Sequence, residues 1–290
     1  MILITGASGT VGRAVLEEVR KEHQAVTAMY RNAQDARNVP VGTQAVIADF
    51  SDEESLRKAL AGVESVFLVC SPIPQLVELE SNVIDACKEI GVRHVVLNSA
   101  LGAGKFNKSF PSWHAKVEEK LKGTQLSHTI LRPNGFMQNI LSYDAPTIRT
   151  QNTIYEAMGD AKVSLIDVRD IAVVAAKALL FPGEHAGQTY ELNGPEAVNY
   201  AEIASRISRV MGREVKYVDL PEAAQGKAML DTGIPEWLVT AILDLQAYYR
   251  SGACAEVNDV LRNLLGREPR RLDSFLQESK DSFRSQAAGA

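Results

Sequence analysis

Residues 2–13, ILITGASGTVGR, decide the fold of this chain. Residues 2–5 are typical of a short buried strand. Glycines follow at positions 6, 9 and 12, and an amphipathic run begins at Val11 and continues to about Lys21. This order of strand, glycine-rich loop and helix start predicts the first turn of a dinucleotide-binding βαβ unit.

The three glycines have distinct physical tasks in such a turn. Gly6 permits the tight turn after the strand, Gly9 lets backbone N–H groups approach a pyrophosphate, and Gly12 lets the helix pack close to the sheet. The helix N-terminus adds free N–H donors and a partial positive charge. The alternative is a glycine-rich turn with only a structural task. The cofactor contacts of this turn are expected from Thr5, Gly6, Ser8, Gly9, Thr10, Val11 and Gly12.

The composition disfavours several classes of protein. The net charge of −5 provides no basic field to hold a nucleic acid. The longest apolar stretch, residues 171–181, is interrupted by Lys177 and is too short to span a bilayer. Cys70, Cys87 and Cys254 are scattered and have no metal-like spacing. We therefore expect reduced thiols, no metal site and a cytoplasmic protein.

Arg31 bears on the choice of cofactor. The second strand is expected over residues 25–30 and runs directly into Arg31, with no acid until Asp35. NAD-selective units place an acid about 20 residues past the glycines, where it bonds the ribose 2′-hydroxyl. A guanidinium instead clamps a 2′-phosphate through two parallel hydrogen bonds. Arg31 therefore favours NADP(H), with Arg13 and Arg37 as weaker candidates, and the alternative is an ordinary surface arginine.

The ends of the third and fourth strands complete the expected cofactor edge. The third strand, residues 44–48, leads to Asp49 and Phe50, which suit the edge and the face of an adenine. A simple polar strand end is an equally good interpretation of these two residues. The fourth strand, residues 65–70, runs into a loop at the edge where open α/β folds bind ligands. From this loop we expect cofactor contacts of Cys70, Ser71 and Pro72.

Hydrophobic periodicity predicts the remaining elements, and Ser51 with Glu54 predicts a capping box before the first helix among them. Strands are expected at residues 93–98, 127–131, 163–166, 188–192 and 214–218, and helices at residues 53–61, 76–90, 168–180, 200–211 and 237–250. Residues 221–232 are charged, rich in small residues and broken by a glycine, which predicts a mobile lid. The fold is therefore predicted to be α/β, a Rossmann-type doubly wound parallel sheet with a smaller C-terminal α+β substrate lobe. The dinucleotide-binding core is expected over residues 1–132, and residues 133–290 mainly form the lobe, with some segments returning to the core.

Several motifs resemble the short-chain dehydrogenase/reductase superfamily. They are the glycine spacing at 6, 9 and 12, Tyr30-Arg31, Asp49-Phe50 and Ser99. Four further segments narrow the resemblance to the NmrA-like, atypical branch: WHAKVE at 113–118, TILRPNGFMQN at 129–139, DVRDIA at 167–172 and YELNGP at 190–195. This branch includes dye reductases, quinone oxidoreductases, isoflavone-reductase-like enzymes and non-enzymatic NADP-sensing regulators. The resemblance covers roughly residues 1–270 and does not select one activity.

The proton-donating pair of the superfamily is missing. Most members carry Tyr-x-x-x-Lys, with the lysine often followed four residues later by Glu. Aligned on Glu118, those two positions hold Phe110 and His114, and no Tyr-x-x-x-Lys occurs elsewhere in the chain. The resemblance implies that His114 bonds the nicotinamide ribose in place of the lysine, with proton donor and helix cap as alternatives. Ser99 is the second candidate for a catalytic and cofactor-binding residue, and its alternative is a capping serine.

The loop after the sixth strand is expected to cross the nicotinamide end of the site. Cofactor contacts are expected there from Pro133, Asn134 and Phe136. The predicted substrate residues are Trp113, Phe136, Met137, Asn139 and Tyr143, which combine flexible apolar walls with polar handles. The alternative, strongest for Met137, is that these apolar residues are core. Trp237, Tyr248 and Tyr249 are candidates to close over a flat substrate, although aromatic residues at helical spacing are more often core.

Two hypotheses of function follow. The first is an NADPH-dependent reductase that transfers hydride to a conjugated, electron-poor acceptor such as a quinone or a dye. The second is a non-enzymatic NADP(H)-binding redox sensor that acts through a protein partner. The missing Tyr-Lys pair favours the sensor, whereas the mixed apolar and polar loop at 133–143 favours the enzyme. A hydrolase is not supported, because the nucleophile-elbow motif G-x-S-x-G is absent. We expect a small aromatic or quinone-like substrate, and neither a nucleic-acid nor a membrane partner.

Overall fold

The computed structural model describes residues 1–22 and 25–284, and the chain divides into two compact units. Unit 1 comprises Met1–Pro133 and Val168–Leu192, and unit 2 comprises Asn134–Asp167 and the chain from Asn193 onward. The chain thus leaves unit 1 after its sixth strand, returns to it once, and leaves again. None of the helices in the described residues combines the length and the apolar composition that crossing a membrane requires.

Within the described residues, unit 1 is built on a parallel sheet with the strand order β3-β2-β1-β4-β5-β6-β8. The order reverses between β1 and β4, and the crevice outside such a reversal is where open α/β sheets bind ligands. The expected doubly wound parallel sheet is confirmed. The strands are β1 (Ile2–Ile4), β2 (Val26–Tyr30), β3 (Gln44–Ile47), β4 (Ser65–Leu68), β5 (His94–Asn98), β6 (Ser127–Pro133) and β8 (Thr189–Leu192).

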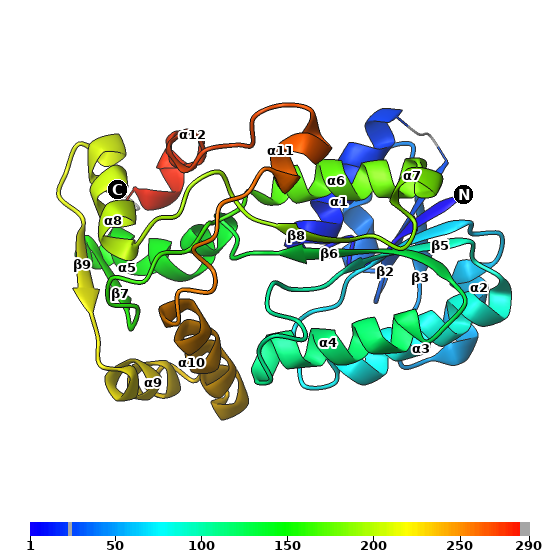
Figure 1. The fold of residues 1–290 in the computed structure, drawn as a ribbon, viewed down its shortest axis with the longest axis horizontal. Coiled ribbons are helices and arrows are strands. Elements are labelled where there is room, and N and C mark those ends of the chain that lie inside the picture. Colours follow the sequence, from blue (N-terminus) through cyan, green and yellow to red (C-terminus); the bar gives the residue numbers. More distant parts are fainter. Residues whose placement is uncertain (23–24, 285–290) are drawn as a thin grey trace. The chain divides into compact units, whose positions relative to one another are not determined.

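Helices cover both faces of this sheet. Figure 1 shows α1 and α6 together on one face and α2, α3 and α4 on the other. Leu3, Val66 and Val95 belong to one apolar cluster with the inward side chains of α2, α3 and α4. Strands covered on both faces are continuous apolar runs, which is why this core was visible in the sequence. The helices are α1 (Thr10–Glu22), α2 (Glu53–Leu60), α3 (Leu76–Ile90), α4 (Ser109–Lys122), α6 (Val168–Leu180) and α7 (Pro182–His185), with a 3-10 turn at Asp35–Asn38.

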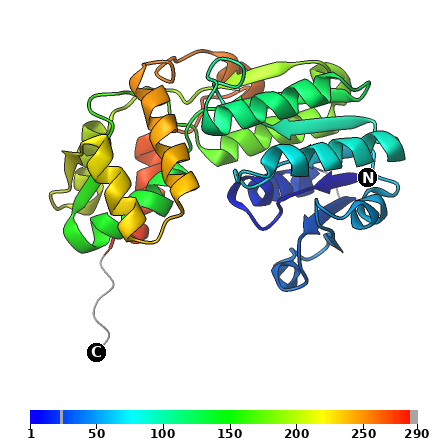
Figure 2. The same ribbon diagram turned by 90° about the horizontal axis from the view of Figure 1, so that it is seen from below.

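Unit 2 is mostly helical. Its core gathers Met137, Ile154, Ile207 and Phe275, and α9 and α10 lie side by side (Figure 2). Its two strands, β7 (Thr153–Glu156) and β9 (Lys216–Asp219), pair in parallel. The helices are a π-helical turn (Ile140–Asp144), α5 (Ala145–Gln151), α8 (Tyr200–Met211), α9 (Glu222–Asp231), α10 (Glu236–Arg250), α11 (Val260–Leu265), α12 (Leu272–Glu278) and a final 3-10 turn (Lys280–Phe283).

Helix α2 is capped by a different residue from the one predicted. The carboxylate of Asp52 accepts hydrogen bonds from the backbone N–H groups of Glu54 at 3.0 Å and Ser55 at 3.2 Å. Ser51 instead donates its backbone N–H and its hydroxyl to Asp49 Oδ1. The predicted capping box of Ser51 and Glu54 is therefore wrong, because the acid one residue later reaches the free N–H groups of the first turn.

Two predicted segments of unit 2 have different structures. Residues 163–166 make only isolated bridges, Phe136 with Ile166 and Val163 with Val198, so a strand there is wrong. Residues 221–232, for which the sequence predicts a mobile lid, contain helix α9, and a lid role for this helix stays a prediction. Gly226 interrupts the helical pattern for a packing reason, since a Cβ there would lie 3.1 Å from Leu243 Cδ1 of α10. Strand β7 was not predicted.

Candidate functional site

The turn between β1 and α1 is shaped by two glycines. Gly6 has a φ of +56°, a conformation that L side chains rarely adopt. A Cβ on Gly12 would lie 2.2 Å from the carbonyl oxygen of Gly6, so only glycine lets α1 approach this closely. The N–H of Gly9 closes the turn by donating to the carbonyl of Gly6 at 2.9 Å. The structural tasks expected of Gly6 and Gly12 are confirmed.

The tip of this turn is open to solvent. Ser8, Gly9 and Thr10 are exposed at the N-terminus of α1, where helical N–H groups lack partners within the helix. Val11 buries its side chain, which limits any ligand contact to its backbone. Thr5 requires a correction. Its hydroxyl donates to the carbonyl oxygens of Phe67 and Val69 and accepts from the N–H of Val69, so it joins β1 to β4 and is not available to a cofactor.

Arg31 follows β2 as an exposed guanidinium. It forms no ion pair and no hydrogen bond with any residue of the described chain. Its charge helps to lower the pKa of Asp49, although hydrogen bonds from Ser51 are the larger cause. Arg13, in contrast, is paired with Glu17 at 3.0 Å. Arg31 therefore remains the side chain best able to clamp an added anionic group at this edge.

The loop after β4 places the other expected residues at the same edge of the sheet. Ser71 and Pro72 are exposed, and Cys70 is half-buried with its pKa raised to about 12 by burial, so it is a neutral thiol. Phe50, at the end of β3, packs partly against the core of unit 1. All four side chains follow strands whose carboxyl ends lie on one side of the sheet.

Glu80 lies beside this loop and was missed from the sequence. It is fully buried on α3, and the backbone N–H of Cys70 faces it without completing a hydrogen bond. Burial raises the pKa of Glu80 to about 8, so the carboxyl is protonated at neutral pH. The signal was available, since Glu80 occupies the inward face of α3 with Leu76 and Ile84.

Glu118 is the centre of a buried ion-pair network in unit 1. Arg132 donates Nε to Oε1 at 2.8 Å and Nη2 to Oε2 at 2.6 Å, which is a bidentate pair. Ser99 donates its hydroxyl to Oε1 at 2.6 Å, and Lys122 donates to Oε2 at 3.1 Å. Burial by itself raises the pKa of Glu118, but hydrogen bonds from Arg132, Ser99 and Lys122 hold it below the usual value. The hydroxyl hydrogen of Ser99 is thus used in the hydrogen bond to Glu118. A direct role for Ser99 in the reaction stays a prediction.

His114 lies within α4, four residues before Glu118. Because α4 begins at Ser109, His114 does not cap the helix. Burial lowers the pKa of His114 to about 4, although the charge of Glu118 opposes the shift, so the ring is neutral at pH 7. Its Nδ1 is buried and has no hydrogen-bond partner in the described chain, and the same holds for Oδ1 of Asn98 at the end of β5. Two buried polar atoms without partners, one at the end of β5 and one in α4, fit a polar ligand. The sequence analysis had not selected Asn98.

Asn134 requires a second correction. Its Nδ2 donates to Asn193 Oδ1 and to the carbonyl of Cys254, both at 2.9 Å, and its Oδ1 accepts from the N–H of Gly135. The amide is therefore used within unit 2 to fix the start of the loop, so the expected cofactor contact is not available to it. Pro133 ends β6 in unit 1 as a buried residue, and its carbonyl accepts from the N–H of Leu101.

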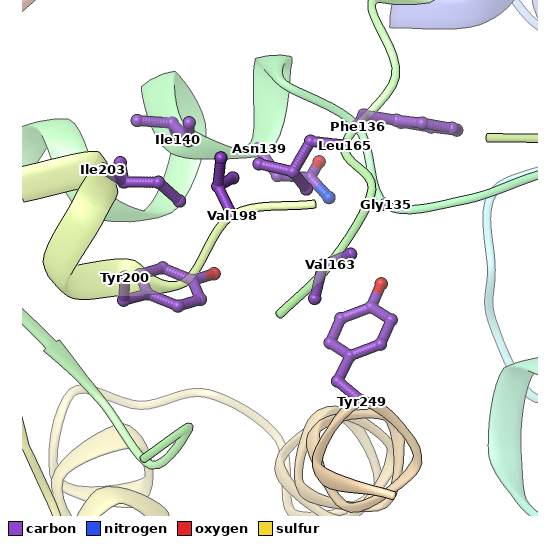
Figure 3. A pocket seen from close by; sticks show the side chains of 10 residues that line it. All are labelled: Gly135, Phe136, Asn139, Ile140, Val163, Leu165, Val198, Tyr200, Ile203 and Tyr249. Atoms are coloured by element: carbon purple, nitrogen blue, oxygen red, sulfur yellow. The ribbon is translucent and has the colours of Figure 1, made fainter. Parts of the chain in front are cut away.

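Unit 2 contains a small cavity of about 30 Å³ (Figure 3). Phe136, Asn139 and Leu165 contribute to its wall, and Tyr200 and Tyr249 turn their hydroxyls into it. A space of this size holds a group no larger than one or two waters. Of the predicted substrate residues, Phe136 and Asn139 thus meet at one cavity.

The other predicted substrate residues lie elsewhere. Met137 is completely buried in the core of unit 2, so its predicted substrate contact is wrong and its alternative as a core residue holds. Tyr143 is 66% exposed and does not line the cavity. Trp113 belongs to unit 1, where its ring meets Phe110 edge to face at 5.4 Å. Tyr248 is buried, as its alternative predicted.

The residues of unit 1 fit a dinucleotide phosphate. The close approach of α1 at Gly12 forms a backbone cradle, the exposed tip provides N–H donors, and Arg31 provides an unpaired cation. Asn98 and His114 add buried polar atoms that lack partners. By contrast, the described residues contain no group of His, Cys, Asp and Glu that could hold a metal ion.

Comparisons with known proteins agree with this fold. The model of the NmrA-like family matches residues 1–276. An NAD(P)H azoreductase of Xenophilus azovorans is 34% identical over 285 residues, covering 98% of this chain and 99% of that protein. An NADPH-dependent quinone oxidoreductase of Escherichia coli, solved with NADPH, superposes with a TM-score of 0.88 at 29% identity, covering 96% and 99% of the two chains. A triphenylmethane reductase of a Citrobacter species shares the fold, with a TM-score of 0.87 at 22% identity and coverage of 97% and 99%.

Proposed function

Because this chain belongs to the NmrA-like family, we propose that it is an NADPH-dependent reductase of conjugated, electron-poor acceptors such as quinones and dyes. The observation that carries the proposal is the combination of the glycine turn with the unpaired guanidinium of Arg31. Relatives that cover nearly the whole chain are oxidoreductases, and the chain is an oxidoreductase.

The cofactor is NADP(H), which supplies a hydride when it is bound. We propose that the backbone N–H groups of residues 8–11 bind its pyrophosphate and that Arg31 binds its 2′-phosphate. Asn98 and His114 are proposed to hydrogen-bond its nicotinamide half, because each presents a buried polar atom without a partner, Asn98 at the carboxyl end of β5 and His114 within α4. Unit 1 is thus proposed as the cofactor domain and unit 2 as the acceptor lobe.

The chemistry of the site favours delocalised acceptors. Reducing an ordinary ketone creates an alkoxide, which needs a positioned acid in the transition state. In unit 1, the ring of His114 is neutral, and the hydroxyl of Ser99 donates its hydrogen bond to Glu118, so neither serves as that acid. A reduced quinone delocalises its charge and takes a proton from water later. For such acceptors, holding the two reactants close together in the reactive orientation supplies most of the rate enhancement.

The test is a side-by-side assay of NADPH oxidation at saturating cofactor. A quinone and an azo dye should be reduced readily, and a simple aliphatic ketone should react far more slowly. Faster reduction of the ketone would contradict the proposed chemistry. Tight NADPH binding with no acceptor reduced would instead favour the redox-sensor hypothesis. Three free cysteines are typical of a reducing compartment, and we propose the cytoplasm as the location.

A further inference from the structure

Two phenol groups in unit 2 have no place in the function described so far. Tyr200 begins α8 and Tyr249 lies near the end of α10, and both line the 30 Å³ cavity. Neither hydroxyl hydrogen-bonds to any other group in the described chain. Both side chains are half-buried, and a hydroxyl that lines a cavity without a partner is available to a ligand.

The cavity is kept open beside the hydroxyl of Tyr249. A Cβ on Gly135 would lie 3.0 Å from Tyr249 Oη and 3.1 Å from Leu165 Cδ2, so any side chain at Gly135 would crowd this wall. Figure 3 shows both hydroxyls directed toward the middle of the ring of lining residues. The remaining wall is apolar apart from Asn139. The result is a slot that admits a polar atom but excludes an aromatic ring.

Burial and, after it, the charge of two nearby buried carboxyl groups keep the hydroxyl of Tyr200 protonated. Asp144 and Glu156 hydrogen-bond to each other, and burial raises the pKa of both, with Asp144 raised the more strongly. Glu156 Oε2 also accepts hydrogen bonds from Gln225 Nε2 at 2.5 Å and Gln246 Nε2 at 2.6 Å. Burial, together with the charge of this pair, raises the pKa of Tyr200 well above the usual value.

Tyr249 is protonated for a simpler reason. Burial is the largest cause of its raised pKa, and it has no carboxylate partner. Both phenols are consequently protonated hydrogen-bond donors at neutral pH. Neither can act as a base, and each keeps its own proton when it meets an anion.

We propose that Tyr200 and Tyr249 donate hydrogen bonds to a carbonyl oxygen of a quinone acceptor, and that this oxygen alone enters the slot while the ring stays outside it. The proposal rests on the proposed function and makes the two tyrosines specificity-determining residues for oxygen-bearing acceptors. Hydride addition brings an electron pair to the quinone and oxidises NADPH to NADP⁺, and the added charge comes to rest on the carbonyl oxygen. The two phenol donors stabilise that oxygen, and a proton from water completes the hydroquinone. Donors fixed in advance at a developing oxyanion typically contribute 10²–10³-fold in rate.

A cationic triarylmethane dye distinguishes stabilisation of a carbonyl oxygen from a purely structural role of the tyrosines. Hydride addition to its central carbon neutralises a positive charge and creates no oxyanion. Loss of a phenol donor should therefore slow the quinone and leave the dye nearly unaffected. A tyrosine that only shaped the lobe would affect both acceptors alike.

The experiment compares Tyr200→Phe, Tyr249→Phe and the double variant with wild type, using menadione and crystal violet at saturating NADPH. Tyr155→Phe is the matched control, because it removes a phenol of the same unit whose hydroxyl donates only to Gln151 Oε1. Each single variant should lower kcat/KM for menadione about tenfold or more and change crystal violet less than about threefold. Calorimetric titration of menadione into the NADP⁺ complex should show weaker binding for the double variant and no change for Tyr155→Phe.

The outcomes separate this inference from the proposed function. Menadione rates within twofold of wild type for both single variants, or equal losses with both acceptors, would overturn the role of the phenols while leaving the reductase intact. If wild type reduces no acceptor, the proposed function fails. In that case calorimetry alone decides, and menadione binding that is unchanged in the double variant overturns the slot as well.

Discussion

Glu118 and Glu80 are buried carboxyl groups on the packed helices α4 and α3 of unit 1, yet Glu118 is ionised and Glu80 is protonated at neutral pH. Glu118 is 2% exposed and ionised, because Arg132, Ser99 and Lys122 donate to both of its oxygens. Glu80 is fully buried without an ion pair, and its pKa is raised to about 8. The difference shows that burial favours the neutral acid and that well-placed hydrogen-bond donors and cations reverse this preference.

The same contrast separates two arginines. The side chain of Arg132 is 15% exposed and forms an ion pair with Glu118, so its role is structural. Arg31 is exposed and carries an unpaired charge at the carboxyl edge of the sheet. A paired charge stabilises the fold, whereas an unpaired one is available to a ligand. Substitutions at Arg132, Glu80, Arg31 and His114 test this difference between paired and unpaired groups.

The largest effect is expected from Arg132→Met. It leaves the Glu118 carboxylate buried without its bidentate partner, and breaking a buried pair in this way costs about 3–5 kcal/mol. Urea unfolding at pH 7 measures the loss. Arg57→Met removes an exposed ion pair with Glu53 and Glu89 and should leave the midpoint unchanged. Equal midpoints for the two variants would show that Glu118 does not depend on Arg132.

Glu80→Gln should stabilise the protein. The folded-state pKa of Glu80 is about 8 and the unfolded value is near 4.5, so between these values the unfolded state releases a proton that the folded state keeps. Stability is therefore lost as pH rises from about 4.5 to 8, and glutamine removes the penalty by staying neutral. The expected gain at pH 7 is about 3 kcal/mol.

Thermal unfolding from pH 5 to pH 8 checks this sign. The gap between Glu80→Gln and wild type should widen as pH rises. Glu78→Gln, at an exposed position of the same helix, is the matched control and should follow wild type at every pH. A gap that stays constant with pH would mean that Glu80 is ionised throughout this range.

Arg31→Ala should weaken NADPH and spare NADH. A charge-assisted hydrogen-bonded pair contributes about 1.5–3 kcal/mol, which corresponds to about ten- to hundredfold in Kd. Fluorescence titration with both cofactors measures the ratio. NADH is the internal control, since it lacks the 2′-phosphate. Equal affinity of wild type for the two cofactors would contradict the assignment of Arg31.

The smallest effect is expected from His114→Ala. Because burial holds the pKa of His114 near 4, the ring is neutral and offers hydrogen bonds but no titrating proton between pH 6 and 8. Turnover should fall about tenfold or less, and the wild-type rate should be flat across that range. A wild-type rate that follows a single group near pH 6.5 would restore the proton-donor hypothesis.

Features that depend on residues close together in the chain could be predicted without the structure. The turn at Gly6 and Gly12 follows from backbone conformation and contact distance within a few residues. Helices α3, α6 and α8 were predicted with the bounds that they have, because the 3.6-residue pattern and glycines just past α3 and α8 are local signals. The family resemblance was carried by the same contiguous motifs, and the family match confirms it.

The packing of distant segments determines which polar side chains are already hydrogen-bonded within the protein. Thr5 and Asn134 looked available in the sequence, but Val69 and Cys254, 64 and 120 residues away, use their hydrogen bonds. The pairing of Glu118 with Arg132 and the meeting of Tyr200 with Tyr249 at one cavity likewise join distant segments. Side-chain chemistry and local periodicity are properties of neighbours along the chain. Burial, pKa and the choice of hydrogen-bond partner depend on which segments pack together, and that is set by the whole fold.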